Sequence, residues 1–232
     1  IARVIVASIL APEVFGTFTM AMIVSSGLAV MGEFGLGAFL IQRKDSDLKE
    51  QHFNAAFFLS FGLMVAALLL TYYVITPIYS DYLDVKLVSQ ILPVLILAPF
   101  ITCMSVVPRA ILIRELKFKE LGIITIAGHF LSVVALFVSL KLGFGIWSLV
   151  YQVITHSLIL TIFTYALTKW KPSIKVDKKS VKEVIGFSGY DIIQRMFTYL
   201  TQNLDKFIIG KILGASILGI YYISIIFTEL IR

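Results

Sequence analysis

Charged side chains inside the long apolar stretches are the residues of this sequence best suited to chemistry. Arg195 lies near the middle of one stretch, Lys206 lies further along the same stretch, and Arg3 lies inside another. Burying a charge at mid-membrane costs about 2.5–3.5 kcal/mol even on lenient insertion scales, so such residues are expected to serve a function. An arginine can hold the oxygens of an anion through two parallel hydrogen bonds, whereas a lysine acts as a point charge. We expect Arg195, Arg3 and Lys206 to line a basic, anion-binding cavity. The alternative is that they reach the membrane interface or form structural ion pairs, such as Lys206 with Asp205.

Asp205 is the acidic residue best placed to couple an ion to such a cavity. A carboxylate can take up a proton or help to bind sodium, because hard cations prefer oxygen ligands. The alternative is a local salt bridge that holds its helix against a neighbour. Glu33 lies inside the end of another apolar stretch. It either lines the cavity or, as we favour, pairs with Arg43 or Lys44.

Two histidines, His129 and His156, also fall within apolar stretches. A membrane histidine can relay protons, but a hydrogen bond between helices is its more common role. No close group of histidine, cysteine and carboxylate residues marks a metal site. The single cysteine, Cys103, excludes an intrachain disulfide. The sequence predicts no cofactor, no metal and no catalytic residues.

Glycines and prolines mark local features of two stretches. The segment 32–37 (GEFGLG) superficially resembles a phosphate-binding loop, but no Lys-Ser/Thr pair follows it. We expect it to lie inside an apolar helix, where its small residues let helices approach closely. Pro93, Pro99 and Pro108 fall in another stretch and should bend it.

The composition shows that a membrane must surround these residues. Hydrophobic residues make up 59% of the 232 residues and charged residues 15%, whereas about a quarter of a soluble domain is charged. Lipid-exposed backbone must satisfy its own hydrogen bonds, so the stretches should be helices rather than β-strands. The sequence predicts an all-α, polytopic membrane helix bundle of about eight segments. They span residues 1–11, 14–41, 53–79, 87–113, 121–141, 144–168, 185–213 and 215–232, and the first and last are truncated.

Lysines and arginines in the short loops set the predicted orientation. Basic residues gather in alternate connections: Arg43, Lys44 and Lys49; Arg109, Arg114, Lys117 and Lys119; and six lysines between residues 169 and 182. The other connections contain almost none apart from Lys86 and Lys141. We therefore place the basic loops and the N-terminus in the cytoplasm.

Two short segments of the chain are similar to each other. Residues 8–18 and 211–221 align at an offset of 203 (219 − 16), which matches an Ile-Leu pair, a glycine and an aromatic residue and places Arg3 opposite Lys206. Six predicted crossings separate the copies, so both enter the membrane from the same side. This predicts two parallel six-helix lobes related by an axis along the membrane normal.

The repeat also predicts how the chain is divided. Residues 1–168 would form the N-terminal lobe, 169–184 a basic cytoplasmic loop and 185–232 the first two helices of a second lobe. Both ends of the chain fall inside apolar segments, so we expect it to be part of a longer protein.

Short motifs in a familiar order run through nearly the whole chain. They are LAPEVFG (10–16), GLGAFLIQRK (35–44), PRA (108–110), RELKFKEL (114–121), GFGIWSL (143–149), WKP (170–172), NLDKFIIGKILG (203–214) and LGIY (218–221). Through them the chain resembles the Wzx-type polysaccharide flippases of the multidrug/oligosaccharidyl-lipid/polysaccharide exporter superfamily. Ser8 departs from relatives that often carry arginine before the first loop, and Arg3 is the nearest residue that could replace it.

The resemblance implies a transporter and not an enzyme. Such proteins move an oligosaccharide linked to polyprenyl pyrophosphate from the cytoplasmic to the outer leaflet, by alternating access of two lobes driven by an ion gradient. Arg195, Arg3 and Lys206 would neutralise the pyrophosphate, and Asp205 would couple the ion. The implied partners are the lipid-linked oligosaccharide, the bilayer, a polysaccharide polymerase and glycosyltransferases, with no nucleic acid. The implied location is the plasma (inner) membrane of a bacterium.

Two other functions are alternatives. A cation-coupled multidrug exporter of the same superfamily would favour an acidic, aromatic cavity, whereas the charges within these segments are mainly basic. A membrane-embedded polyprenyl-linked glycosyltransferase or polymerase would need acidic residues in a large outer loop, and the predicted outer loops are short. We therefore predict a flippase.

Overall fold

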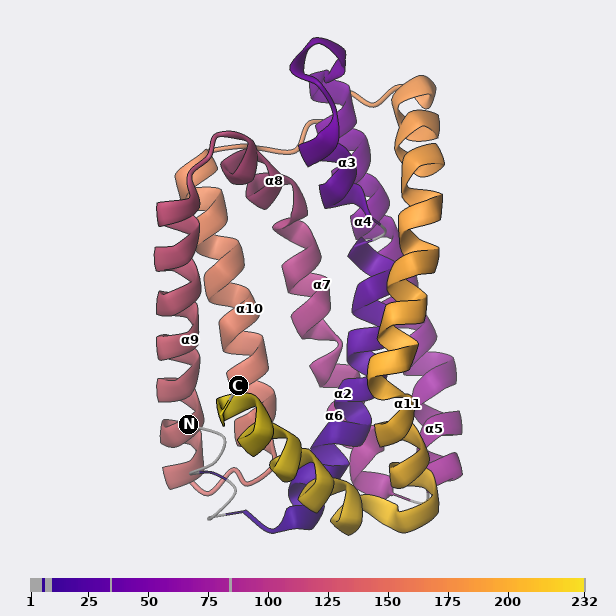
Figure 1. Ribbon diagram of the computed structural model, residues 1–232, viewed down its shortest axis with the longest axis vertical. Helices are drawn as coiled ribbons and strands as arrows, with labels where there is room; N and C mark the ends of the chain where they lie inside the picture. The colour runs from indigo at the N-terminus through magenta and orange to yellow at the C-terminus, as the bar shows by residue number, and fades with distance from the viewer. Residues whose placement is uncertain (1–5, 7–9, 34, 84, 232) are drawn as a thin grey trace.

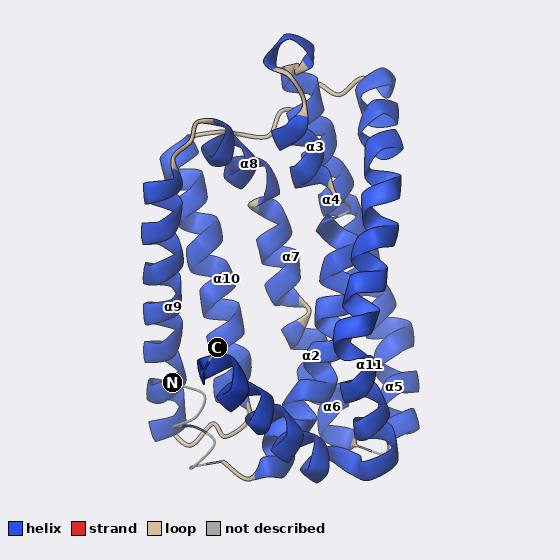
Figure 2. Ribbon diagram, viewed as in Figure 1, coloured by secondary structure: helices blue, strands red, loops and turns tan. Residues whose placement is uncertain are grey.

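The computed structural model describes residues 6, 10–33, 35–83 and 85–231, and all regular elements in these ranges are helices (Figures 1 and 2). Within them, 6 helical runs are long and apolar enough to cross a membrane. The predicted all-α, polytopic membrane helix bundle is therefore confirmed. In chain order the elements are α2 (Pro12–Glu33), α3 (Leu36–Gln42), the 3₁₀ turn η1 (Asp45–Asp47), α4 (Glu50–Leu70), the π-helical turn η2 (Thr71–Ile75), α5 (Thr76–Leu83), α6 (Lys86–Leu95), α7 (Leu97–Met104), α8 (Val106–Arg114), α9 (Phe118–Lys141), α10 (Trp147–Thr168) and α11 (Lys178–Ile231).

The helical runs match the predicted segments closely from the second to the sixth. They are Pro12–Gln42, Glu50–Tyr79, Lys86–Arg114, Phe118–Lys141 and Trp147–Thr168. The predicted seventh and eighth segments meet at Gly214, where α11 leaves the helical conformation with φ 82 and ψ 175. That backbone conformation is essentially restricted to glycine. The first predicted segment, 1–11, falls almost wholly outside the described residues.

Connections alternate between the two ends of the bundle (Figure 1). The links from α3 to α4, from α8 to α9 and from α10 to α11 lie at the upper end of the view, and these are the basic loops. The start of α2, the links α5–α6 and α9–α10 and the bend at Gly214 lie at the lower end. Helix α11 begins at Lys178, so part of the predicted basic loop is already helical. The side of the membrane on which each end lies stays a prediction.

Prolines divide the fourth crossing into α6, α7 and α8, as predicted. Pro99 has no N–H for the carbonyl of Leu95, four residues earlier. The Ser25 hydroxyl on α2 donates to that carbonyl instead, at 3.3 Å. The Thr161 hydroxyl on α10 likewise donates to the carbonyl of Ile101, at 3.0 Å. Neighbouring helices thus supply the donors that the broken helix lacks.

The second crossing is also broken, which the sequence did not predict. Helix α2 ends at Glu33 and α3 begins after Gly35, whose φ of 64 is left-handed. The expectation of a continuous helix over 32–37 is therefore wrong. The expectation of close packing is right, because a Cβ on Gly32 would lie 2.0 Å from Met64 Sδ and one on Gly35 would lie 2.5 Å from Asp191 Oδ2.

A single π-helical turn, η2, joins α4 to α5 in the third crossing. The Thr71 hydroxyl donates to the carbonyl of Ala67 at 2.7 Å at its start. Tyr72 and Tyr73 point outward there, 60% and 69% exposed. Beyond the turn, Tyr79 is buried and its hydroxyl donates to the carbonyl of Met20 on α2 at 3.3 Å.

The apolar core lies along α2, with α11 packed over much of its length (Figure 1). The largest cluster of buried side chains fills the lower end of the bundle and includes Phe15, Phe18, Ile91, Leu95 and Leu136. Outward-facing positions also carry large apolar residues, such as Ile126 and Phe130 on α9, at 71% and 66% exposure. Such a surface is suited to contact with lipid rather than water.

Candidate functional site

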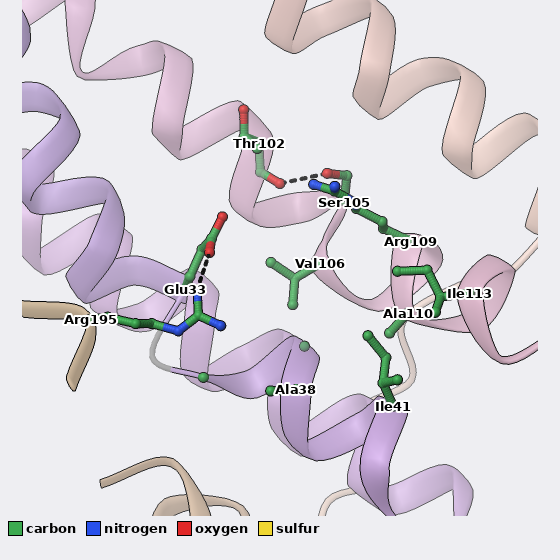
Figure 3. A pocket seen from close by; sticks show the side chains of 12 residues that line it. Glu33, Ala38, Ile41, Thr102, Ser105, Val106, Arg109, Ala110, Ile113 and Arg195 are labelled. Atoms are coloured by element: carbon green, nitrogen blue, oxygen red, sulfur yellow. Dashed lines mark hydrogen bonds and ion pairs between the residues drawn. The ribbon is translucent and has the colours of Figure 1, made fainter. Parts of the chain in front are cut away.

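A cavity of about 280 Å³ lies where the two broken crossings face each other and α11 (Figure 3). Its walls come from the gap between α2 and α3, from the junction of α7 and α8, and from α11 at Arg195. The polar residues that line it are Glu33, Thr102, Ser105, Arg109 and Arg195. It lies towards the end of the bundle that carries the basic loops, because α3 and α8 form part of its wall (Figure 1).

Arg195, one of the three predicted cavity residues, lines this cavity. Its Nε donates to Asp191 Oδ2 at 2.5 Å, one turn earlier on α11, and its Nη1 donates to Glu33 Oε2 at 3.4 Å. The side chain is 40% exposed, so the guanidinium keeps donors that face the cavity. We favoured a pair between Glu33 and Arg43 or Lys44, and this is wrong: Glu33 contacts Arg195, which brings α2 and α11 together across the cavity wall.

Arg109 is a second cavity arginine, and the sequence did not identify it as one. We assigned it to a basic loop, but it lies within α8, where it is exposed and lines the cavity. Its guanidinium forms no hydrogen bond or ion pair with another described residue. The apolar run 106–113 continues on both sides of it, and that continuity was the available signal that Arg109 belongs to the helix.

A smaller cavity of about 180 Å³ extends the site towards the middle of the bundle. It shares Glu33 and Thr102 with the first cavity. Its other polar side chains are hydroxyls from α2 and α10, namely Ser25, Ser26 and Ser157. Together the two cavities offer charged groups near the basic-loop end and hydroxyl groups further in.

Asp205 and Lys206 lie outside both cavities. Lys206 Nζ is 3.7 Å from Asp205 Oδ1, and it also donates to the carbonyl of Gln202 and to Asn203 Oδ1. Asp205 Oδ2 accepts a hydrogen bond from the Tyr221 hydroxyl at 2.6 Å, across the bend at Gly214. The structure therefore does not bring Lys206 next to Arg195. Arg3, the third predicted cavity residue, lies outside the described residues.

A charged network ties the start of α11 to α4 and to the residue after α3 at the basic-loop end. Glu183 Oε2 lies 2.5 Å from Arg43 Nη2 and 3.2 Å from His52 Nε2. The backbone N–H of Lys49 donates to His52 Nδ1 at 2.9 Å. Because Nδ1 accepts, the neutral ring carries its proton on Nε2 and donates it to Glu183. This network holds the end of α11 beside α3 and α4.

Arg114 fixes the end of α3, the short helix that forms one cavity wall. Its Nη1 donates to the carbonyls of Leu40 at 2.5 Å, Ile41 at 3.3 Å and Arg43 at 2.7 Å, and its Nη2 pairs with Asp45. These carbonyls lie at the C-terminal end of a helix, where the dipole favours a cation. A residue that we predicted as a loop cation is therefore a helix cap.

His129 and His156 come together between α9 and α10, with ring centroids 4.4 Å apart and ring planes 28° from parallel. Neither lines the cavities described above. Among the described residues, no group of three or more histidine, cysteine or carboxylate side chains could hold a metal ion. Cys103 is buried as a free thiol.

Comparison with known proteins finds relatives in bacterial polysaccharide synthesis. The succinoglycan biosynthesis transport protein ExoT of Rhizobium meliloti is 25% identical over 217 residues, which cover 94% of this chain and 43% of the relative. The teichuronic acid biosynthesis protein TuaB of Bacillus subtilis is 25% identical, with 83% and 40% covered. The lipopolysaccharide biosynthesis protein WzxC of Escherichia coli is 22% identical, with 95% and 44% covered. The chain thus spans about two fifths of the length of these relatives, and no solved structure matches it.

A family match agrees with these relatives. The family described as polysaccharide biosynthesis protein matches residues 5–231, which is nearly the whole chain. The resemblance that the sequence motifs predicted is thereby confirmed. The chain belongs to this polysaccharide biosynthesis family of membrane proteins.

Proposed function

We propose that the full-length protein is a flippase that moves a polyprenyl-pyrophosphate-linked oligosaccharide from the cytoplasmic to the outer leaflet, for synthesis of a surface polysaccharide. Three relatives carry names from succinoglycan, teichuronic acid and lipopolysaccharide biosynthesis, and one is named a transport protein. The observation that carries the proposal is the cavity between two broken crossings that both Arg109 and Arg195 line.

The charges of this cavity suit a diphosphate group. Arg195 is partly neutralised by Asp191 and Glu33, whereas the guanidinium of Arg109 has no partner among the described residues. A guanidinium pairs with phosphate oxygens through two parallel hydrogen bonds, and these charge-assisted bonds are about twice as strong as neutral ones. Arg109 would therefore bind the diphosphate first, and Arg195 would join it as the anion displaces Glu33.

The hydroxyl groups deeper in the bundle suit a sugar. Ser25, Ser26 and Ser157 line the smaller cavity next to Thr102, and a hydroxyl can both donate and accept hydrogen bonds. Sites of this kind use a few polar groups within apolar walls to orient a ligand. The apolar outer faces of the bundle would leave the polyprenyl chain in the lipid.

The proposed orientation places the cavity close to the cytoplasmic leaflet, where the substrate is made. The basic loops at that end would lie in the cytoplasm under the positive-inside rule. Residues 1–168 would act as one lobe and residues from 185 onward as the start of a second lobe, with alternating access between them. Asp205 is the proposed ion-coupling residue. Its hydrogen bond from Tyr221 spans the bend at Gly214, so movement at the bend would change this bond.

The proposal is tested with Arg109→Ala and Arg195→Ala in the full-length protein. Each variant should reduce transport of a lipid-linked oligosaccharide into the outer leaflet of proteoliposomes at least tenfold, a loss of about 1.4 kcal/mol. The matched control is Lys171→Ala, which removes an exposed cation outside the cavity. Normal transport by both arginine variants at normal protein level would refute the proposed site. Transport of organic cations in place of the oligosaccharide would favour the multidrug exporter.

A further inference from the structure

The two copies of the internal repeat contact each other at the end of the bundle opposite the basic loops. Gly16 in α2 faces the turn that follows Gly214, and a Cβ on Gly16 would lie 1.7 Å from the carbonyl oxygen of Ala215. A Cβ on Gly219 would lie 1.8 Å from the carbonyl oxygen of Pro12. Real Cβ atoms essentially never come within 3.0 Å of such atoms, so at both points backbone packs directly on backbone.

The two contacts are reciprocal under the repeat. Gly16 corresponds to Gly219 at the repeat offset, and Pro12 corresponds to Ala215 at the same offset. In the first copy, Gly16 contacts Ala215, which is the equivalent of Pro12. In the second copy, Gly219, the equivalent of Gly16, contacts Pro12. Such an exchange is the signature of a self-complementary contact about a two-fold axis. The axis predicted for the two lobes would thus pass between these glycines.

Apolar side chains pack around this contact. Leu218, next to Gly219, is fully buried, and Phe15, next to Gly16, is fully buried as well. A Cβ on Gly210 would meet Leu218 and Met20 at 3.2 Å, so the neighbouring helices are also close. The backbone bend at Gly214 turns the last part of α11 across the lower end of the bundle (Figure 1).

We propose that Gly16 and Gly219 form a self-complementary closure of the transport path at the end opposite the basic loops. The two cavities lie further along α2, at Ser25, Ser26 and Glu33, so separation of the repeat copies would open those cavities towards this end. Between Pro12–Gly16 and Ala215–Gly219, the structure shows backbone against backbone and no ion pair, so these segments separate without breaking one. Because neither glycine carries a Cβ, the two segments can pack closely, and this favours the closed state of the transport path over the open state. This inference rests on the proposed transport function and adds the residues that close the path.

The test is the rate at which a membrane-impermeant maleimide, added outside intact cells, labels Ala29→Cys in the full-length protein with its other cysteines removed. Ala29 lines the smaller cavity. Gly16→Ala or Gly219→Ala should increase that rate about tenfold or more, equivalent to about 1.4 kcal/mol, because the added methyl cannot fit in the closed contact. The matched control is Gly62→Ala, where a Cβ meets nothing within 4 Å, and its rate should not change.

A second measurement keeps the native glycines and so does not depend on how the alanine variants fold. Glu13 and Ser216 are exposed, are equivalent in the repeat and lie next to Pro12 and Ala215. A short bis-maleimide should join Glu13→Cys to Ser216→Cys in the otherwise unaltered protein. Absence of this cross-link, or unchanged labelling in both folded glycine variants, would overturn the closure. Neither measurement needs a substrate. Both therefore test the closure independently of the proposed binding site, even if Arg109→Ala and Arg195→Ala transport normally.

Discussion

Replacing Arg114 should loosen the wall of the cavity without touching its charged groups. Arg114 donates to three carbonyls at the end of α3 and pairs with Asp45. Helix α3 has only seven residues and starts at a left-handed glycine, so it depends on such contacts more than a long helix does. In Arg114→Ala the three carbonyls lose their charged donor, and Gly37, Ala38 and Ile41, which line the cavity, lose their anchor.

The size of the effect can be worked from the contacts. A hydrogen bond to a charged group contributes about 1.5–3 kcal/mol, and removing one partner of a buried charged network costs about 3–5 kcal/mol. The Arg114 side chain is only 16% exposed, whereas Asp45 is 95% exposed, so the buried range rests on the three carbonyl bonds and not on the ion pair. A loss of 1 kcal/mol lowers the melting temperature by about 2–4 °C in chains of 150–250 residues. Arg114→Ala should therefore melt roughly 6–20 °C below the unaltered protein in detergent.

A neighbouring ion pair supplies the matched control. Lys117 Nζ lies 2.6 Å from Glu115 Oε2, but the two side chains are 42% and 45% exposed. Exposed pairs contribute about 0–1 kcal/mol, so Lys117→Ala should hardly change the melting temperature. Arg114→Lys keeps the charge but loses the planar guanidinium, so its melting temperature should lie between those of Arg114→Ala and Lys117→Ala. If Arg114→Ala melts no lower than Lys117→Ala, the capping argument is refuted.

Three further changes test other parts of the fold. Gly214→Ala should lower the free energy of unfolding by about 1–3 kcal/mol, because only glycine readily adopts φ 82 with ψ 175; an unchanged chemical denaturation midpoint contradicts this. Ser25→Ala should cost about 1–3 kcal/mol by the same measurement, because the carbonyl of Leu95 loses its donor, and a neutral effect would show that water replaces the hydroxyl. Hydrogen bonds from Ser180, close to the start of α11, hold the pKa of Asp177 below its ordinary value. The stability that Asp177 adds is therefore present above its unfolded pKa and lost as the pH falls through the lower, folded pKa. Asp177→Asn should flatten the acid limb of a plot of melting temperature against pH, and an acid limb identical to that of the unaltered protein would count against this role.

The sequence predicted the crossings well because their signal is local. Runs of apolar residues bounded by lysine and arginine locate helix ends without knowledge of their neighbours, and Pro93, Pro99 and Pro108 predicted the bends in the fourth crossing. The break at Gly35 was missed, and its surroundings are not local: the glycine lies against Asp191 on α11, which is distant in sequence.

The candidate site was predicted only in part for the same reason. Arg195 was identified from its place within an apolar run, which is a property of the chain alone. The contact of Arg195 with Glu33 depends on how α11 packs against α2, and the sequence offered Arg43 and Lys44 as nearer partners. Arg109 was assigned by its neighbours in the loop, although the helix around it turns its side chain into the cavity.

The π-helical turn η2 makes one part of the third crossing tolerant of a change in length. A π turn absorbs one residue more than an α-helical turn, whereas one residue removed from a regular α-helix rotates the rest of that helix by about 100°. Loss of one residue within Thr71–Ile75 should therefore convert the turn to regular α-helix and leave Tyr79 facing the carbonyl of Met20. Loss of a residue within α4 would instead rotate Tyr79 away from α2. Homologous chains that differ in length by one residue in this crossing should carry the gap at this turn.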